Sequence, residues 1–166
     1  MSENTTKSDD PPEGFSEDSP DKKLLEKRWG KEVFANGYLV IPSILLRAQA
    51  RLHIDCVELA VLLHLLDHWW SDDKMPFPSK RRLGERLGRS AKTIQRAMVR
   101  LEEEGLIRRK ARKNSAGGQT SNLYDLTPLV EKLQPIAKEM LEAKADAKQT
   151  IRSSERPGHK LRKAAN

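Results

Sequence analysis

The sequence predicts a mainly α-helical α+β fold, in which a helix-turn-helix unit is followed by a small β-hairpin and a C-terminal helix. Two short amphipathic helices, at residues 80–87 and 91–104, are separated by a glycine-containing turn. Two β-compatible runs, at residues 106–110 and 120–126, flank a Gly-rich loop. An apolar repeat with spacings of three and four then begins at Leu126, which is typical of a further helix.

The first amphipathic helix has clear start and stop signals. Ser79 can cap its N-terminus, and Gly88 can adopt the positive φ that ends a helix. Leu83 and Leu87 share one face at the i, i+4 spacing. Gly84 lies inside the helix and is expected to loosen it by roughly 1 kcal/mol relative to alanine.

The second helix, capped by Ser90 and stopped by Gly105, has one apolar face and one polar face. Its apolar face consists of Ile94, Ala97, Met98 and Leu101. In a helix-turn-helix unit this helix can enter the DNA major groove, where its N-terminal half reaches the base edges. The predicted base-reading residues are Ser90, Lys92, Thr93, Gln95 and Arg96.

The predicted contacts divide into those that read bases and those that position the phosphate backbone. Gln95 suits paired hydrogen bonds to adenine, and Arg96 or Lys92 suits guanine. The predicted backbone contacts are Ser79, Lys80, Arg82, Arg89 and Arg100. Arg112 and Lys113 flank the hairpin tip, so this hairpin is a basic wing that can grip phosphates or enter the minor groove.

These motifs resemble the winged helix-turn-helix families of bacteria, and most of all the branch found in phage and plasmid replication proteins and related small regulators. The similarity rests on a signature that covers about half of the chain. Gly84 departs from it, since alanine is usual there. The entry motif around residues 37–46 is also similar. The signature residues are Pro78, Ser79, Leu83, Leu87, Gly88, Ser90, Thr93, Arg96, Leu101, Gly105, Leu106, Ile107 and Arg109.

The positive charge is concentrated in the predicted binding unit. Residues 78–113 contain thirteen Lys or Arg and four Glu, a local balance of +9, whereas the whole chain of 166 residues carries +7. Such clustering indicates a phosphate footprint, with a solvated helix face as the alternative. The expected partner is double-stranded DNA.

The single cysteine, Cys56, allows no intramolecular disulfide and suits a bacterial cytoplasm, where the protein would associate with the nucleoid when bound to DNA. We expect Cys56 to be buried. The sequence has no signal-peptide pattern and no apolar run long enough to cross a membrane.

The expected organisation has four parts. Residues 1–21 form a disordered acidic tail with seven acidic residues and one Lys, and residues 22–127 form the DNA-binding domain. Residues 128–150 form the C-terminal helix, and residues 151–166 form a disordered basic tail. Within the domain, residues 38–41 are expected to be a strand that pairs with the base of the hairpin.

A helix capped by Asp55 is expected over residues 56–70 and is apolar nearly all round, as the central helix of a small core would be. His64 and His68 have the i, i+4 spacing of metal ligands, but the sequence shows no third ligand, so no metal site is predicted.

The C-terminal helix is expected to start with Thr127 as its cap and Pro128 in its first turn. Pro135 predicts a kink or a division into two helices. The apolar seam either packs on its own domain or pairs with a second copy, and its length favours a homodimer. The predicted dimerisation residues are Leu129, Leu133, Ile136 and Met140.

The sequence therefore predicts a sequence-specific DNA-binding protein, used in transcriptional regulation or, as an alternative, as an initiator or accessory protein of plasmid or phage replication. A winged helix that serves only as a protein-binding adaptor is a rival from another class, although it would need no basic recognition helix. No Walker A loop, catalytic triad or paired carboxylates in a recognisable setting are found, so no enzyme activity, catalytic residue or cofactor is predicted, and no small-molecule ligand is evident.

Overall fold

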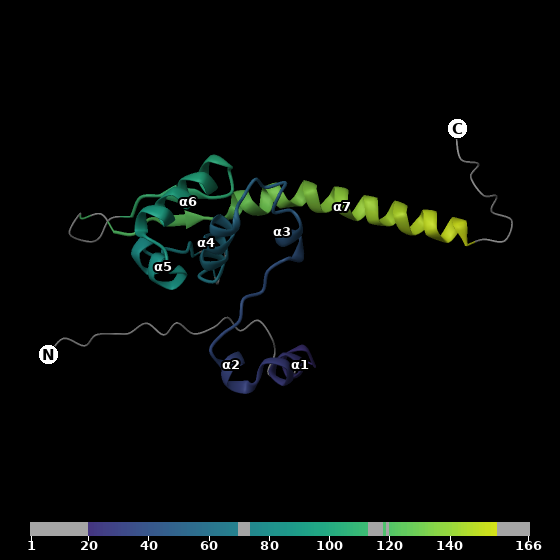
Figure 1. Ribbon diagram of the computed structural model, residues 1–166, viewed down its shortest axis with the longest axis horizontal. Helices are drawn as coiled ribbons and strands as arrows, with labels where there is room; N and C mark the ends of the chain where they lie inside the picture. The colour runs from purple at the N-terminus through teal and green to yellow at the C-terminus, as the bar shows by residue number, and fades with distance from the viewer. Residues whose placement is uncertain (1–19, 70–73, 113–117, 119, 156–166) are drawn as a thin grey trace.

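The computed structural model describes residues 20–69, 74–112, 118 and 120–155. Figure 1 shows helix α4 in the middle of the body, α5 and α6 beside it, and α7 extending away from the hairpin end. Helices α1 and α2 are set apart from this body. In chain order the elements are α1 (Pro20–Trp29), α2 (Lys31–Ala35), α3 (Ser43–Arg47), α4 (Cys56–Leu66), α5 (Lys80–Leu87), α6 (Ala91–Glu103), β1 (Arg108–Lys110), β2 (Leu123–Asp125) and α7 (Thr127–Ser154).

The mainly helical α+β fold with a winged helix-turn-helix is confirmed. Strands β1 and β2 form a two-stranded antiparallel sheet with Arg109 opposite Tyr124. A single apolar core joins the helix-turn-helix, the hairpin and the first half of α7, because each element contributes its apolar face. Its largest fully buried side chains are Tyr124, Leu45, Leu52, Leu62, Leu65, Leu83, Ile94, Met98, Leu101, Leu106, Ile107 and Leu126.

Helix α4 begins as predicted but is shorter. The carboxylate of Asp55 accepts from the Glu58 N–H, and the Glu58 carboxylate accepts from the Asp55 N–H, each at 2.8 Å. These reciprocal bonds form a capping box. The helix ends at Leu66 rather than at residue 70, and Asp67 is its C-cap. Cys56 is exposed rather than buried, because it occupies the first helical position, away from the core face.

The predicted strand at residues 38–41 is wrong. These residues adopt no strand, and Val40 is 71% exposed. The outer edge of β2 is instead occupied by the segment before α5, since the Tyr124 N–H donates to the Pro76 carbonyl at 2.9 Å. A two-stranded sheet offers few open positions for a third chain segment, and residues 74–76 take this one.

The turn between α5 and α6 depends on Gly84, in contrast to the expectation that glycine merely loosens the helix. A Cβ atom at this position would lie 2.5 Å from the carbonyl oxygen of Arg89. The Arg89 N–H in turn donates to the Gly84 carbonyl at 2.8 Å. Gly88 completes the turn in the left-handed conformation with a φ of 61°. The close approach of backbone to backbone therefore requires glycine at position 84.

Helix α7 is one continuous helix from Thr127 to Ser154 with Pro135 inside it, so the predicted division into two helices is wrong. Leu133 and Ile136, on either side of this proline, are both buried in the core, which holds the helix in place there. The N-cap is Leu126 rather than Thr127, and the Asp125 carboxylate accepts from the Thr127 N–H at 3.0 Å. The helix also continues four residues beyond its predicted end at residue 150.

The hairpin is tied to its neighbours by two carboxylates. Glu102 of α6 accepts from Nε of Arg109 at 2.6 Å and from the Arg109 backbone N–H at 3.2 Å. These hydrogen bonds lower the pKa of the Glu102 carboxyl. The pKa of Asp125 is also lowered, first by its hydrogen bond with Thr127 and then by Lys110. Both groups therefore favour the ionised form in the folded state.

We predict that Gly84→Ala lowers the free energy of unfolding by about 1–3 kcal/mol, as overpacking does in a site that cannot relax. Helix propensity alone predicts the opposite sign, a gain of about 1 kcal/mol. Urea unfolding followed by circular dichroism measures the change. Arg81→Ala in the same helix is the control, expected within about 0.5 kcal/mol of the wild type. A Gly84→Ala protein as stable as the wild type would contradict the close contact.

We predict that stability falls as the pH is lowered below about 4.5, the ordinary pKa of the Glu102 carboxyl. A carboxylate with a lowered folded-state pKa stabilises the fold above its ordinary pKa, and this contribution is lost as the pH falls through the folded value. Urea midpoints between pH 6 and pH 3 should fall less steeply for Glu102→Gln than for the wild type. Glu103→Gln, which removes an exposed neighbouring carboxylate, should keep the wild-type slope; equal slopes for all three proteins would rule out this role.

Candidate nucleic-acid interface

Helix α6 is held so that its polar face remains open. The Ser90 hydroxyl accepts from the Thr93 N–H at 3.1 Å and starts the helix. Ile94, Ala97 and Met98 are buried against the core. The opposite face, with Lys92 and Arg96, is exposed. The local sequence pattern therefore decides which side chains of the helix can meet a partner.

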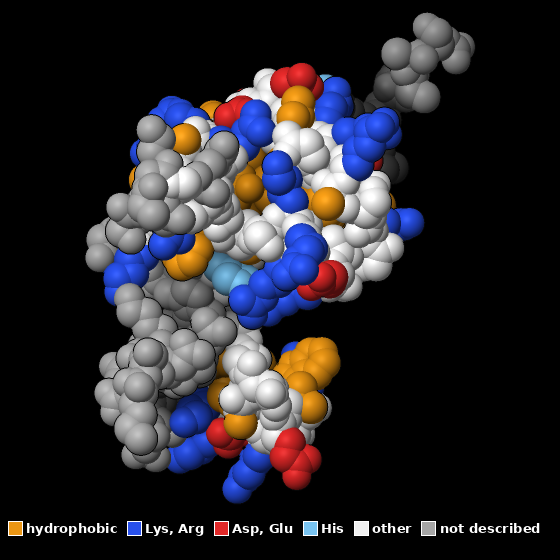
Figure 2. Space-filling view, turned by 90° about the vertical axis from the view of Figure 1, so that its left-hand side faces the viewer, with side chains coloured by type: hydrophobic (Ala, Val, Ile, Leu, Met, Phe, Trp, Pro, Cys, Tyr) orange, Lys and Arg blue, Asp and Glu red, His pale blue; other side chains and the backbone are white. Residues whose placement is uncertain are grey.

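Four of the predicted contact residues carry unneutralised charge. Arg82, Arg89, Lys92 and Arg96 are all exposed, and none of them forms a salt bridge with any residue that the structure describes. Figure 2 looks at the hairpin end of the molecule and shows Lys and Arg side chains running across the upper body, with few acidic ones among them. A polyanion is the partner that such a surface favours.

Two residues with different predicted roles are in contact. Lys80, predicted to meet the DNA backbone, donates from Nζ to Oε1 of Gln95, predicted to read a base, over 2.5 Å. Lys80 is the first residue of α5 and Gln95 lies in the second turn of α6. No periodicity within either helix could predict this contact, because it depends on how the two helices cross.

The Ser90 and Thr93 hydroxyls are also joined. Their oxygens lie 2.9 Å apart, and Ser90 Oγ already accepts from the Thr93 N–H. Both residues are at the start of α6, where base-reading residues were predicted. Their hydroxyls therefore serve first as the helix cap, and any contact with a base would have to share them.

Arg100 differs from the other predicted contacts with the DNA backbone because carboxylates already pair with it. Its Nε is 3.4 Å from Oε1 of Glu58, and its Nη2 is 3.9 Å from a carboxylate oxygen of Glu104. Glu58 is only 6% exposed. The guanidinium thus compensates a buried carboxylate that also caps α4, and it ties α6 to α4. Arg100 is therefore already paired with two carboxylates, while its side chain stays 53% exposed.

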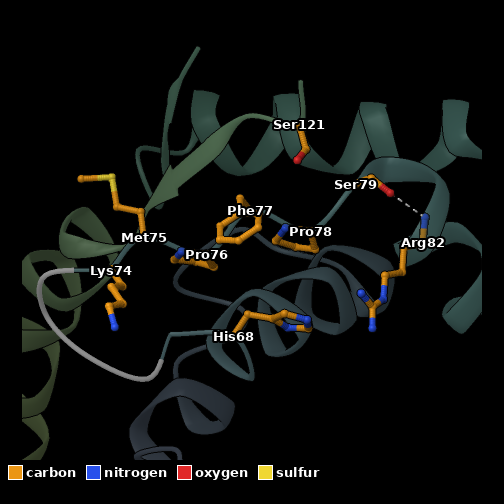
Figure 3. Close-up of a pocket in the computed structure, with 9 residues that line it drawn as sticks. All are labelled: His68, Lys74, Met75, Pro76, Phe77, Pro78, Ser79, Arg82 and Ser121. Carbon is orange, nitrogen blue, oxygen red and sulfur yellow. Dashed lines mark hydrogen bonds between the residues drawn. The ribbon is translucent and has the colours of Figure 1, made fainter. Parts of the chain in front are cut away.

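A groove of about 400 Å³ lies next to the N-terminus of α5. Figure 3 shows residues from just after α4, from the segment before α5, from the first turn of α5 and from the approach to β2 around it. It contains the predicted Ser79 and Arg82, but also Lys74 and His68, which sequence reasoning missed because both lie outside the helix-turn-helix. Its lining residues are His68, Lys74, Met75, Pro76, Phe77, Pro78, Ser79, Arg82 and Ser121.

The base of the wing is anchored by an aromatic contact. The Arg112 guanidinium lies over the Phe77 ring, 4.4 Å from its centroid. The Thr120 N–H donates to the Arg112 carbonyl at 3.0 Å, which closes the base of the hairpin loop. Lys113, the other predicted wing residue, lies outside the described residues. Phe77 could not be linked to the wing from sequence, since thirty-five residues separate it from Arg112.

The predicted dimerisation residues fall into two groups. Leu129, Leu133 and Ile136 are buried in the core of their own domain, so this part of the seam follows the alternative of packing on the domain itself. Met140 is 37% exposed and begins the exposed second half of α7. Arg51 pairs with Glu139 at 2.6 Å near the point where the helix leaves the body.

The two histidines with metal-ligand spacing, His64 and His68, make ordinary structural contacts. His68 Nδ1 lies 2.9 Å from the His64 carbonyl, and burial followed by the nearby Arg86 lowers the pKa of His64. Among the residues that the structure describes, no three metal-ligating side chains gather in one place. Within the same residues no helix has the length and apolarity needed to span a membrane.

Comparison with known proteins identifies the domain. Residues 41–145 match the family described as the DnaD N-terminal domain. The crystal structure of the N-terminal domain of DnaD protein from Geobacillus kaustophilus HTA426 has 26% identity and a TM-score of 0.51, over 75% of this chain and 96% of that chain. No curated protein sequence matches the chain.

Two further solved structures have weaker similarity. A possible transcriptional regulator from Methanosarcina mazei Go1 has 18% identity and a TM-score of 0.42, over 65% of this chain and 85% of that one. The crystal structure of MarR has 19% identity and a TM-score of 0.35, over 82% of this chain and 96% of that one.

The matched region contains α3, the whole helix-turn-helix, the hairpin and most of α7. It therefore covers the core and the candidate interface, and well over half of the chain. The resemblance to replication-related winged-helix domains is confirmed, and it supports a DNA-binding or replication-related function. The chain belongs to the DnaD N-terminal domain family.

Proposed function

We propose that the protein binds double-stranded DNA sequence-specifically, with α6 in the major groove and the hairpin wing against the adjacent backbone. The observation that carries this proposal is the exposed face of α6, where Lys92 and Arg96 are free of acidic partners among the described residues. A face that served only to solvate the helix would gain from neutralising pairs along it. Unpaired cations on a helix of this kind suit phosphates and guanine edges.

The backbone contacts in this proposal surround the recognition helix. Arg82 lines the groove at the start of α5, and Arg89 lies in the turn. Lys74 adds a cation to the same groove. On the wing side, Arg112 keeps its guanidinium over Phe77, which gives it a defined position at low conformational cost. Cations on two sides of α6 would hold the helix in register on a duplex.

The family favours a replication-related use of this binding, which was the alternative to transcriptional regulation in the sequence-based prediction. The same interface would serve either process, since both need a protein that finds a particular site on duplex DNA. The protein-adaptor alternative has less support, because an adaptor has no need of the free cations on α6.

We further propose that two copies associate through the second half of α7. Met140, Leu141 and Ile151 are exposed there, and none of them contributes to the core of the domain. With Ala143 and Ala147, Met140 continues the predicted apolar seam at spacings of three and four. The buried residues of the first half would then orient this part of the helix rather than form the interface.

The decisive experiment is selection from a random pool of duplex DNA, followed by sequencing, across a salt series. An enriched motif would establish specific recognition, and an inverted repeat within it would support two copies. Salt-sensitive binding without an enriched motif would mean that the protein binds DNA without sequence specificity, in an architectural role. Absence of binding at low salt would overturn the proposal in favour of the adaptor.

Arg96→Ala should weaken binding to the selected site by about 1–3 kcal/mol and weaken binding to random DNA less, because a base contact is lost. Arg82→Ala should weaken both by a similar factor and reduce the salt slope by about one unit. Fluorescence anisotropy at several salt concentrations measures both effects. If Arg96→Ala weakens the two DNAs equally, its base-reading role is wrong.

Met140→Glu should shift the protein towards monomer, because it places a charge in the apolar seam. Sedimentation equilibrium at micromolar concentrations measures the change, and the domain should stay folded since Met140 lies outside the core. Lys138→Glu, at an exposed position off the seam, is the matched control and should leave the association unchanged. A wild-type protein that is monomeric over the same range would contradict dimerisation.

A further inference from the structure

The contact between Lys80 and Gln95 alters what the recognition helix can read. Lys80 Nζ donates to Gln95 Oε1 over 2.5 Å, so the start of α5 reaches the polar face of α6. Lys80 is exposed and Gln95 is partly exposed, and both lie at the end of the helix-turn-helix proposed to face DNA. The two side chains therefore act as one polar group at this face.

The hydrogen bond from Lys80 occupies the acceptor oxygen of Gln95 and leaves its NH₂ donors available. A glutamine amide has one oxygen that accepts and one NH₂ group with two donors. Here the oxygen accepts from a cation, while the NH₂ group keeps both donors. The Lys80 ammonium has three N–H donors and uses one on Gln95. The pair consequently presents mainly donors, with a positive charge beside its one acceptor.

The bases of the major groove differ in how well they suit this arrangement. Adenine presents N7 as an acceptor and its N6 amino group as a donor, so bidentate reading by glutamine needs the amide oxygen to accept from N6. In this protein the N6 donor could use only the second lone pair of that oxygen, beside the positive charge of the ammonium group. Guanine presents N7 and O6, which are both acceptors. One can bond to the Gln95 amide and the other to Lys80.

We propose that Lys80 and Gln95 together read guanine, with Lys80 as a specificity-determining residue rather than a phosphate contact. This inference rests on the proposed binding of duplex DNA by α6, and it replaces the adenine preference expected for Gln95 alone. It assigns a base-reading role to a residue of α5, the first helix of the helix-turn-helix. The pairing depends on the close crossing of α5 and α6 that Gly84 permits.

The contact itself is testable without DNA. In NMR spectra of the full chain, Lys80→Met should shift the side-chain NH₂ resonances of Gln95, because the cation leaves its amide oxygen. Arg81→Met removes the same charge from the neighbouring residue of α5, and Arg81 pairs with Glu85 rather than with Gln95. This control should leave those resonances in place. Equal spectra for Lys80→Met and the wild type would overturn the proposal.

The base preference is tested by repeating the random-pool selection with the wild type and three variants. Gln95→Ala identifies the position that Gln95 reads, since information is lost there. The wild type should prefer guanine at this position, and Lys80→Met should change the guanine-to-adenine ratio about tenfold in favour of adenine. Arg81→Met should leave the preference at that position unchanged.

The outcomes separate this inference from the broader proposal. A wild-type protein that enriches no motif overturns the proposed DNA reading and the guanine preference with it. An enriched motif with adenine at the Gln95 position, or with no position that responds to Gln95→Ala, overturns the guanine preference alone. If Lys80→Met weakens binding to all sequences by the same factor, Lys80 is a phosphate contact. This result would also overturn the guanine preference.

Discussion

The close approach between Gly84 and Arg89 is the constraint on which the rest of the interface depends. A Cβ at position 84 would be 2.5 Å from the Arg89 carbonyl, and the hydrogen bond from the Arg89 N–H to Gly84 has its usual length. This contact sets how tightly α5 folds back on α6. The buried faces of both helices reach one core, and their polar faces share one surface. A wider turn would separate Lys80 from Gln95 and misalign the cations that surround α6.

A second link fixes α6 from its other side. Glu58 caps α4 with one carboxylate oxygen and meets Arg100 with the other. A buried carboxylate without a partner is costly, so this pair resists separation. The Glu102 contact with Arg109 does the same for the hairpin. These two contacts thus tie α6 to α4 on one side and to strand β1 on the other.

Much of this could be predicted from local sequence. The start of α5 at Ser79, the turn at Gly88 and the apolar face of α6 follow from caps and periodicity, which act within a few residues. The segment that lies beside β2 could not be predicted from sequence. Residues 38–41 and 74–76 were both possible neighbours, and only three-dimensional packing decides between them. The same applies to Arg100 and Lys80, whose partners lie on other helices. Charge alone indicates that a side chain is polar and exposed, but not whether it is already neutralised.

Beyond Ile136, α7 leaves the body and extends away from the end that carries α5, α6 and the hairpin (Figure 1). Eighteen residues, 137–154, continue without a break, which at 1.5 Å per residue is about 27 Å of helix. Because its first half is buried in the core, this exposed half cannot swing freely about the domain. A partner that binds along this half of the helix would therefore be held in a set direction from the polar faces of α5 and α6.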